Sequence, residues 1–415
     1  MLSLGQLALR SLWNRRGLAL CAICSIALSV FALLGVQQIR QGARSSFAGT
    51  VAGTDLIVGA RSSPLSLLLY SIFHLGEATH NLAWTSYQTV AAWPEVAWAV
   101  PLSLGDSHRG FRVLGTTHGL YDHYRYGAGR SLRFASGQPN VALYEAVVGA
   151  EVAAQLDYAP GREIILAHGI GSFVEHRDRP FQVSGVLART GTPLDRTVIV
   201  SLQAIEAIHA GWQSGIPGPT PGDASTAAAV EPASITAILL GLRQRTAVFA
   251  LQRRVNTLPT EPLQAIMPGV ALQQLWGLVG VAETALYAVS GLVLVAGLCA
   301  VFAVLLSTLA ERRREIAVLR AVGAHAWLVL LLLLGEAALL SLTGVLLGAA
   351  LLLAGLLLAQ GWIAQEYGLL LSPAWPDAVQ WGMVGAVLLA GLLAGVIPAA
   401  LAYRQALIDG LTPRT

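Results

Sequence analysis

The chain has 415 residues, of which only 12% are charged and 55% are hydrophobic, with a formal net charge of +3. Soluble domains carry roughly 25% charged residues, so this composition excludes a purely soluble or disordered protein. The small net charge gives no argument for a nucleic-acid partner. All 26 basic residues are arginines. Without lysine the chain cannot form a Walker A phosphate loop, so we expect any ATP to be bound by another chain.

Four long apolar segments predict four transmembrane helices, since a hydrocarbon core about 30 Å thick needs about 20 apolar residues. Helix 1 is expected in residues 1–39, behind an N-terminal amphipathic segment, and helices 2 to 4 at 278–310, 326–359 and 378–403. Arginines precede helix 1, occupy the 311–325 loop and follow helix 4, whereas the 360–377 loop has none. The positive-inside rule therefore places both termini, including the 404–415 tail, and the 311–325 loop in the cytoplasm.

Residues 40–277 are then exported as one large domain. Short β-rich stretches alternate there with helical patterns, which predicts a mixed α/β fold. Strands are expected at 55–58, 96–104, 111–115, 141–143, 163–167, 181–187, 197–200 and 234–241. Helices are expected at 145–156, at 202–211 with Ser201 as N-cap, and at 243–256. The Pro-, Gly- and Ala-rich stretch 213–232 predicts a flexible surface loop. The predicted fold class is a membrane α-helical protein with a mixed α/β periplasmic domain inserted between helices 1 and 2.

The most specific motif is the sequence ERRREIAVLRAVGA at 311–324, between predicted helices 2 and 3. It resembles the corresponding segment of the FtsX/MacB family of ABC transporter membrane subunits, which includes LolC and LolE. The segment FQVSGVLARTGTPLDRTVIV at 181–200 resembles the MacB periplasmic core domain. The order of one helix, a large periplasmic domain and three further helices is similar as well.

The resemblance implies a non-catalytic subunit of the bacterial inner membrane that works by mechanotransmission. A separate cytoplasmic ABC ATPase dimer would hold the ATP and Mg²⁺, and this chain would bind no cofactor itself. The implied ATPase-coupling residues are Glu311, Arg312, Arg313, Arg314, Glu315, Arg320 and Gly323. Other implied partners are a second copy or a paralogous membrane subunit, a periplasmic carrier or adaptor protein, and membrane lipids.

The implied function is export or extraction of a lipid-like, peptide or other small substrate. Two alternatives stay open: a non-transporting, FtsX-type regulator of a periplasmic enzyme, and a component of a zinc-linked transport system. The exported domain contains eight of the nine histidines, but His74, Glu77 and His80, or His118 and His123, lack the i, i+4 spacing of a helical zinc site. We therefore expect solvated, scattered histidines and no protein-bound metal.

Two further features of the sequence are a charged residue inside a predicted membrane helix and an apolar stretch in the exported domain. Glu336 lies about ten residues into predicted helix 3, where an exposed charge is costly, so it should face another helix or be protonated. The apolar stretch SLLLYSIFHL at 66–75 predicts a core helix. The alternative is that it lines a groove for a lipid-like or amphipathic ligand.

Overall fold

The computed structural model describes residues 16–50, 52–169, 176–209, 212–213, 216–217, 231–311, 325–367 and 376–409. The chain divides into two compact units. We call the first, which includes Val279–Gly361, the helical unit, and the second, which includes Gly42–Leu278, the α/β unit.

The helical unit is built from α2 (Arg16–Thr50), α10 (Pro268–Glu311), α12 (Ala326–Tyr367) and α13 (Ala378–Asp409). Within the described residues, four helices are long and apolar enough to cross a membrane, at Arg16–Phe47, Pro268–Ser307, Trp327–Ile363 and Ala378–Leu401. The sequence therefore identified all four helices. Three of them, α2, α10 and α12, have residues in both units.

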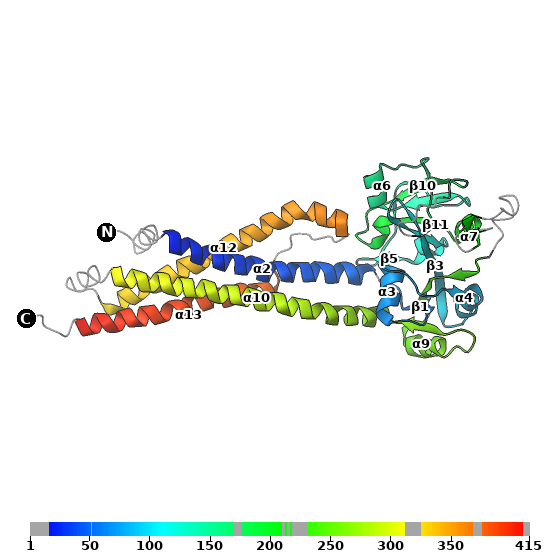
Figure 1. Ribbon diagram of the computed structural model, residues 1–415. Coiled ribbons are helices and arrows are strands. Elements are labelled where there is room, and N and C mark those ends of the chain that lie inside the picture. The colour runs from blue at the N-terminus through cyan, green and yellow to red at the C-terminus, as the bar shows by residue number, and fades with distance from the viewer. Residues whose placement is uncertain are drawn as a thin grey trace, which may run out of the picture. The chain divides into compact units, whose positions relative to one another are not determined.

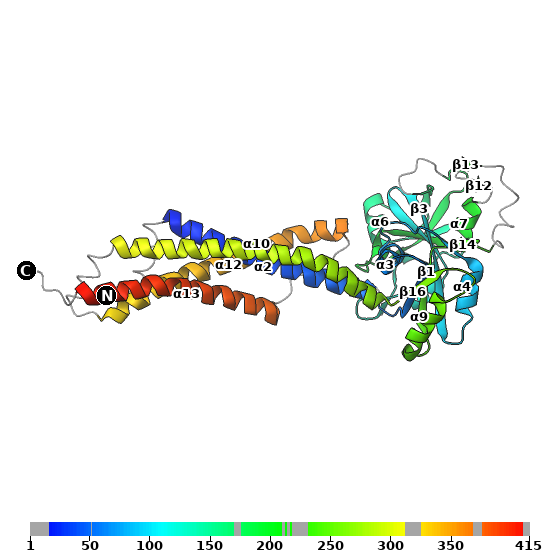
Figure 2. The same cartoon turned by 60° about the horizontal axis from the view of Figure 1, so that its bottom comes forward.

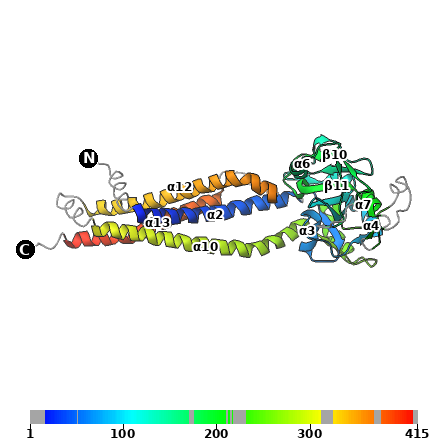
Figure 3. The same ribbon diagram turned by 45° about the horizontal axis from the view of Figure 1, so that its top comes forward.

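Small residues allow these helices to approach closely, as is common in membrane bundles. The position of a Cβ on Gly348 of α12 would lie 2.5 Å from the carbonyl oxygen of Ala27 in α2, and that of Gly297 in α10 would lie 3.1 Å from Ser25. Ile26 and Val30 of α2 are buried in the same apolar cluster as Val304 and Leu340. Figures 1 and 3 show the four helices running alongside one another.

Helix α10 begins ten residues before the predicted start at 278. Its first residue is Pro268, which suits the first turn of a helix because that turn leaves backbone N–H groups unpaired in any case. Ala271 and Leu272 then pack into the core of the α/β unit. The additional turns thus belong to the α/β unit rather than to the predicted membrane span.

The α/β unit contains a mixed sheet with the strand order β16-β1-β15-β3-β4-β11-β8-β10-β7, in which β9 pairs with β10. The pairs β4–β11 and β8–β10 are parallel, and the other neighbours are antiparallel. The strands are β1 (Leu56–Ala60), β3 (Val96–His108), β4 (Phe111–Thr116), β7 (Phe134–Gly137), β8 (Glu145–Val148), β9 (Glu163–Ile164), β10 (Phe181–Leu187), β11 (Thr197–Ser201), β15 (Ala237–Leu242) and β16 (Leu263–Ile266).

Short two-stranded pairings accompany this sheet. They are β2 (Leu82–Ala83) with β14 (Ser234–Ile235), β5 (Arg125–Tyr126) with β6 (Arg130–Ser131), and β12 (Trp212–Gln213) with β13 (Ile216–Pro217). The last pair begins one residue before the predicted 213–232 loop, most of which is outside the described residues.

Both faces of the sheet are covered, because successive strand residues point to opposite sides. In β11, Ile199 joins one core cluster, whereas Val198 and Val200 join another. The first face packs against α3 (Pro64–Ile72) and α5 (Gly119–His123). The second face carries α4 (Trp84–Ala91), α6 (Ala150–Leu156), α7 (Leu202–His209) and α9 (Val248–Asn256). Figure 2 shows α3 and α4 on opposite sides of the sheet.

The sequence prediction for residues 141–156 is wrong in two places. Residues 145–148 form β8 rather than the first turn of a helix, and 141–143 are not a strand. The Glu145 carboxylate accepts hydrogen bonds from the backbone N–H groups of Val141 and Ala142, which fixes a turn there. The helix begins only after Gly149, whose Cβ position would lie 2.1 Å from the carbonyl oxygen of Leu194. Only glycine allows that approach.

Other predictions are confirmed. Helix α7 starts where expected, and the Ser201 hydroxyl accepts a hydrogen bond from the N–H of Ala204, as an N-cap does. Strands β3, β4, β10 and β11 all begin at the predicted residues. Residues 66–72 are helical and mostly buried within α3, so the prediction of a core helix is correct.

The loop between β10 and β11 is organised by one buried carboxylate. Asp195 accepts hydrogen bonds from the backbone N–H groups of Thr190 and Gly191 and from the Thr190 hydroxyl, at 2.7–3.1 Å. Burial raises the pKa of Asp195, an effect that these hydrogen bonds oppose. The residues around the sequence TGTPLD are thus a structural turn.

Candidate functional site

The predicted ATPase-coupling residues lie almost entirely outside the described part of the chain. Glu311 is the last residue of α10, and its side chain is not described. Arg312, Arg313, Arg314, Glu315, Arg320 and Gly323 fall in 312–324, which the structure does not describe. Their role stays a prediction.

Glu336 lies in α12 and is fully buried inside the helical unit. The next residue, Ala337, has its Cβ 2.6 Å from the Cβ position of Gly395 in α13, so this part of α12 lies close to a neighbouring helix. This placement agrees with a carboxyl group that faces the helix bundle.

The histidines that were considered as metal ligands are not brought together. His74 is buried and its Nδ1 lies 2.9 Å from the Thr197 hydroxyl, while His118 hydrogen-bonds the carbonyl of Asn140. His123 stacks on Trp98, with ring centroids 4.9 Å apart. His80 and Glu77 are exposed.

Burial, together with the positive charge of Arg112, lowers the pKa of His74 to about 4.

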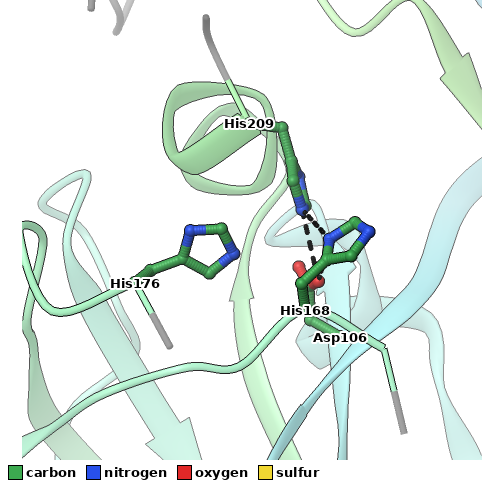
Figure 4. Close-up of side chains that lie close together, drawn as sticks. All are labelled: Asp106, His168, His176 and His209. Atoms are coloured by element: carbon green, nitrogen blue, oxygen red, sulfur yellow. Dashed lines mark hydrogen bonds and ion pairs between the residues drawn. The ribbon is translucent and has the colours of Figure 1, made fainter. Parts of the chain in front are cut away.

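A different set of side chains converges in the α/β unit. Asp106, His168, His176 and His209 each present one ligand-type atom, and these atoms all lie within 4.8 Å of one another. His209 Nε2 is 3.3 Å from Asp106 Oδ1 and 2.9 Å from His168 Nδ1, which is itself 3.6 Å from Asp106 Oδ1. Figure 4 shows the three imidazole rings gathered around the carboxylate. We call these four residues the histidine–aspartate cluster.

A β-bulge turns Asp106 toward this cluster. Even-numbered residues earlier in β3, such as Val100 and Leu102, point into the core beneath α3. The pairing of β3 with β4 shifts by one residue between Leu104 and Ser107. Because side chains alternate along a strand, one extra residue moves Asp106 to the opposite face, where α7 lies.

The segments that carry His168 and His176 are tied to the same strand. Ser107 and Ala167 exchange two backbone hydrogen bonds at 2.8 and 2.9 Å, which places His168 beside Asp106. The backbone N–H of His176 donates to the carbonyl of Leu166 at 2.9 Å. Both histidines are thus held by main-chain contacts, although residues 170–175 between them are outside the described part.

The His209 ring is oriented by its own helix. It lies in the last turn of α7, and its Nδ1 is 2.8 Å from the carbonyl oxygen of Ile205. A carbonyl oxygen only accepts hydrogen bonds, so Nδ1 carries a proton and Nε2 faces Asp106. Burial alone would lower the pKa of His209, but hydrogen bonding and charge from Asp106 raise it above its ordinary value. Burial lowers the pKa of His176, an effect that Asp106 opposes.

The expectation of solvated histidines is wrong for several of them: His176 is only 1% exposed, and His74 and His108 are also buried. No local spacing could have revealed the cluster, because its members come from a strand, a loop segment and a helix end that are far apart in sequence. The sequence feature that could have pointed to the cluster is the presence of eight of the nine histidines in residues 40–277.

The α/β unit also contains a cavity of about 560 Å³, a volume typical of ligand sites. Its lining includes the apolar side chains of Phe47, Phe73, Leu75 and Phe111 together with Arg112 and Arg196. Phe73 to Leu75 belong to the apolar stretch that was expected to form a core helix or to line a groove. The structure shows the helix up to Ile72 and the cavity wall directly after it.

Four apolar helices, with a large mixed α/β unit inserted between the first and the second, define a polytopic membrane protein with one large domain outside the bilayer. Residues 19–257 match the family model of the MacB-like periplasmic core domain, and residues 287–407 match that of the FtsX-like permease C-terminal region. The chain therefore belongs to the FtsX/MacB-like permeases of ABC transporters.

Solved structures give distant similarities. The periplasmic region of MacB from Actinobacillus actinomycetemcomitans is 10% identical, with a TM-score of 0.34, covering 54% of this chain and 95% of that one. The extracellular domain of the noncanonic ABC-type transporter YknZ from Gram-positive bacteria is 11% identical, with a TM-score of 0.31, covering 51% and 99%. Comparison with curated proteins gave no significant match.

Proposed function

We propose that this chain couples ATP hydrolysis by a separate cytoplasmic ABC ATPase to conformational work in the periplasm. Membership of the permease family is the observation that carries the proposal. The absence of lysine supports it, since the Walker A lysine must then come from outside this sequence. In the proposed orientation both termini and the 311–325 loop are cytoplasmic, and the chain pairs with a second copy or a paralogue.

The helices supply a route for this coupling. Both α2 and α10 run from the helical unit into the α/β unit without a break. A tilt or shift imposed on them at the cytoplasmic side would therefore reach the periplasmic domain through continuous helix, which is stiff because its backbone hydrogen bonds are all internal. No substrate pathway through the four helices is needed for such a mechanism.

The cavity supports a lipid-like or amphipathic substrate within this proposal. Its lining combines aromatic side chains with the guanidinium groups of Arg112 and Arg196, which also contact Glu77 and Glu151 and give the cavity positive charge for an anionic head group. The Arg112 side chain is held in place, because it donates a hydrogen bond of 2.6 Å to the carbonyl of Gly76.

Purification of the native complex tests the coupling. We expect an ATPase with a Walker A motif to copurify, and reversal of Arg312, Arg313 and Arg314 to Glu to abolish this association. A matched control reverses the three exposed arginines Arg133, Arg162 and Arg253 of the α/β unit. Retention of the ATPase by the first variant, or its loss from both variants alike, would overturn the assignment of the loop.

A metal-linked transport system is the second candidate, and the histidine–aspartate cluster is the observation that favours it over an FtsX-type regulator. A strain lacking this chain should then grow poorly under zinc limitation and normally with ample zinc. Equal growth of mutant and parent under both conditions would remove this candidate.

A further inference from the structure

We propose that Asp106, His168, His176 and His209 bind one divalent transition-metal ion, with Zn²⁺ as the expected occupant. This inference concerns a binding site within the α/β unit and does not depend on whether the chain couples to an ATPase or transports a substrate.

The spacing of the donor atoms fits a tetrahedral ion. Ligand atoms about 2.0–2.1 Å from Zn²⁺ lie about 3.4 Å from one another in a tetrahedral site. The three measured separations among His209 Nε2, His168 Nδ1 and Asp106 Oδ1 are 2.9, 3.3 and 3.6 Å. The fourth ligand, from His176, lies within 4.8 Å of each of the others. The first three donors are within about 0.5 Å of tetrahedral spacing, whereas the His176 ring would move inward by up to about 1.4 Å to complete the site.

The rings are arranged as ligands of a common centre rather than as a packed stack. The interplanar angles are 74° between His168 and His209, 88° between His176 and His209, and 81° between His168 and His176. Nearly perpendicular rings aim their nitrogen atoms inward from three directions, as Figure 4 shows.

His209 Nδ1 donates a hydrogen bond to the Ile205 carbonyl, as is usual for a metal-bound histidine. Metal-bound histidines usually donate their other ring N–H to a carbonyl or carboxylate, which fixes the tautomer. Nε2 faces the Asp106 carboxylate at 3.3 Å. A cation bound between these two groups would take the place of the Nε2 proton and accept a lone pair from each of them.

The donor set also selects the class of metal. Three imidazoles with one carboxylate suit Zn²⁺ and neighbouring transition metals, whereas Ca²⁺ and Mg²⁺ prefer oxygen ligands throughout. Asp106 and His176 form the buried side of the site, at 2% and 1% exposure. The His168 and His209 side chains are 45% and 26% exposed. An ion can therefore enter from solvent and exchange without unfolding of the domain.

Equilibrium dialysis of the purified full-length chain in detergent against ZnCl₂, after removal of metal with a chelator, tests the site. We expect about one Zn²⁺ per chain by elemental analysis, and visible ligand-field bands of tetrahedral Co²⁺ when Co²⁺ replaces Zn²⁺. His168→Gln should weaken Zn²⁺ binding at least tenfold and remove the Co²⁺ bands, as should Asp106→Asn.

His80→Gln is the matched control, because His80 is an exposed histidine of the same unit outside the cluster. It should bind Zn²⁺ as the parent chain does. His168→Gln alters a half-exposed side chain, and an unchanged far-UV circular dichroism spectrum would establish that this variant is folded. Substoichiometric Zn²⁺ in the parent chain, or equal affinity in folded His168→Gln and His80→Gln, would overturn the proposal.

Discussion

The Nε2 atom of His209 lies 3.3 Å from Oδ1 of Asp106, and this contact joins the end of α7 to the bulge in β3. The loop segment with His168 meets the same two residues, so three parts of the α/β unit converge on one point. An ion bound there would link them and stabilise the folded domain, because the cluster exists only in the folded chain.

Zinc should therefore raise the thermal stability of the α/β unit. Ligand present at 100 times its dissociation constant stabilises a folded state by about 2.7 kcal/mol. For a domain of this size, that corresponds to a rise in Tm of about 5–10 °C. Tryptophan fluorescence during heating of the full-length chain measures it, with Mg²⁺ as the control ion. An equal shift for Asp106→Asn and the parent chain would contradict a site at the cluster.

His74 should make the metal-free domain less stable in mild acid. Its folded-state pKa is about 4, against about 6.5 in the unfolded chain, so between these values the unfolded state binds more protons. The stability is unaffected above pH 6.5 and falls as the pH drops from 6.5 to 4. The loss attributable to His74 is about 3 kcal/mol over that window.

His74→Asn tests this assignment, since Asn tolerates the positive φ of 54° at this position. Denaturant unfolding in the presence of a chelator, at several pH values from 4 to 7, gives the free energy of unfolding for both proteins. The difference between the variant and the parent should shrink as the pH falls. A difference that stays constant with pH would show that His74 is not the titrating group.

The sequence predicted those features that depend on local pattern. The four membrane helices follow from composition, and strands such as β10 follow from alternating apolar residues between turns. The prediction of a helix over 145–156 was wrong at its start, because Ala146, Val147 and Val148 are equally compatible with a helix or a buried strand. Only pairing with β10 and β11 decides between these conformations.

The histidine–aspartate cluster was beyond such prediction for a different reason. Asp106 reaches it only because β3 gains one residue against β4, and this register shift is a property of the pair of strands. His168 is placed by a backbone bridge to Ser107. Neither the register shift nor the backbone bridge can be predicted from the spacing of residues along the chain.

Close packing between α2 and α12 should depend on Gly348. A Cβ there would lie 2.5 Å from the Ala27 carbonyl oxygen and 2.9 Å from Val30 Cβ, so Gly348→Ala forces the backbones apart. Overpacking of this kind costs about 1–3 kcal/mol. The matched control is Gly335→Ala in the same helix, where nothing lies within 4 Å. Thermal unfolding in detergent should show a lower Tm for the first variant alone; equal values would argue against this helix contact.

The buried carboxylate of Asp195 should be needed for the turn between β10 and β11. Both of its oxygens accept hydrogen bonds, and the Oδ2 atom receives the Gly191 N–H at 2.7 Å. Asp195→Asn keeps the shape but places an amide N–H₂ against N–H donors. We expect a loss of about 1–3 kcal/mol, the cost of leaving a buried polar group without a partner.

Asp157→Asn makes the same chemical change at an exposed position with a φ of 55°, where Asn is well tolerated, so it should be nearly neutral. Urea unfolding of the full-length chain, followed by tryptophan fluorescence, measures both variants against the parent. A smaller loss in Asp195→Asn than in Asp157→Asn would mean that the hydrogen bonds to Asp195 do not hold the turn. The expected result, a larger loss in Asp195→Asn, would show that the Asp195 carboxylate stabilises the turn between β10 and β11.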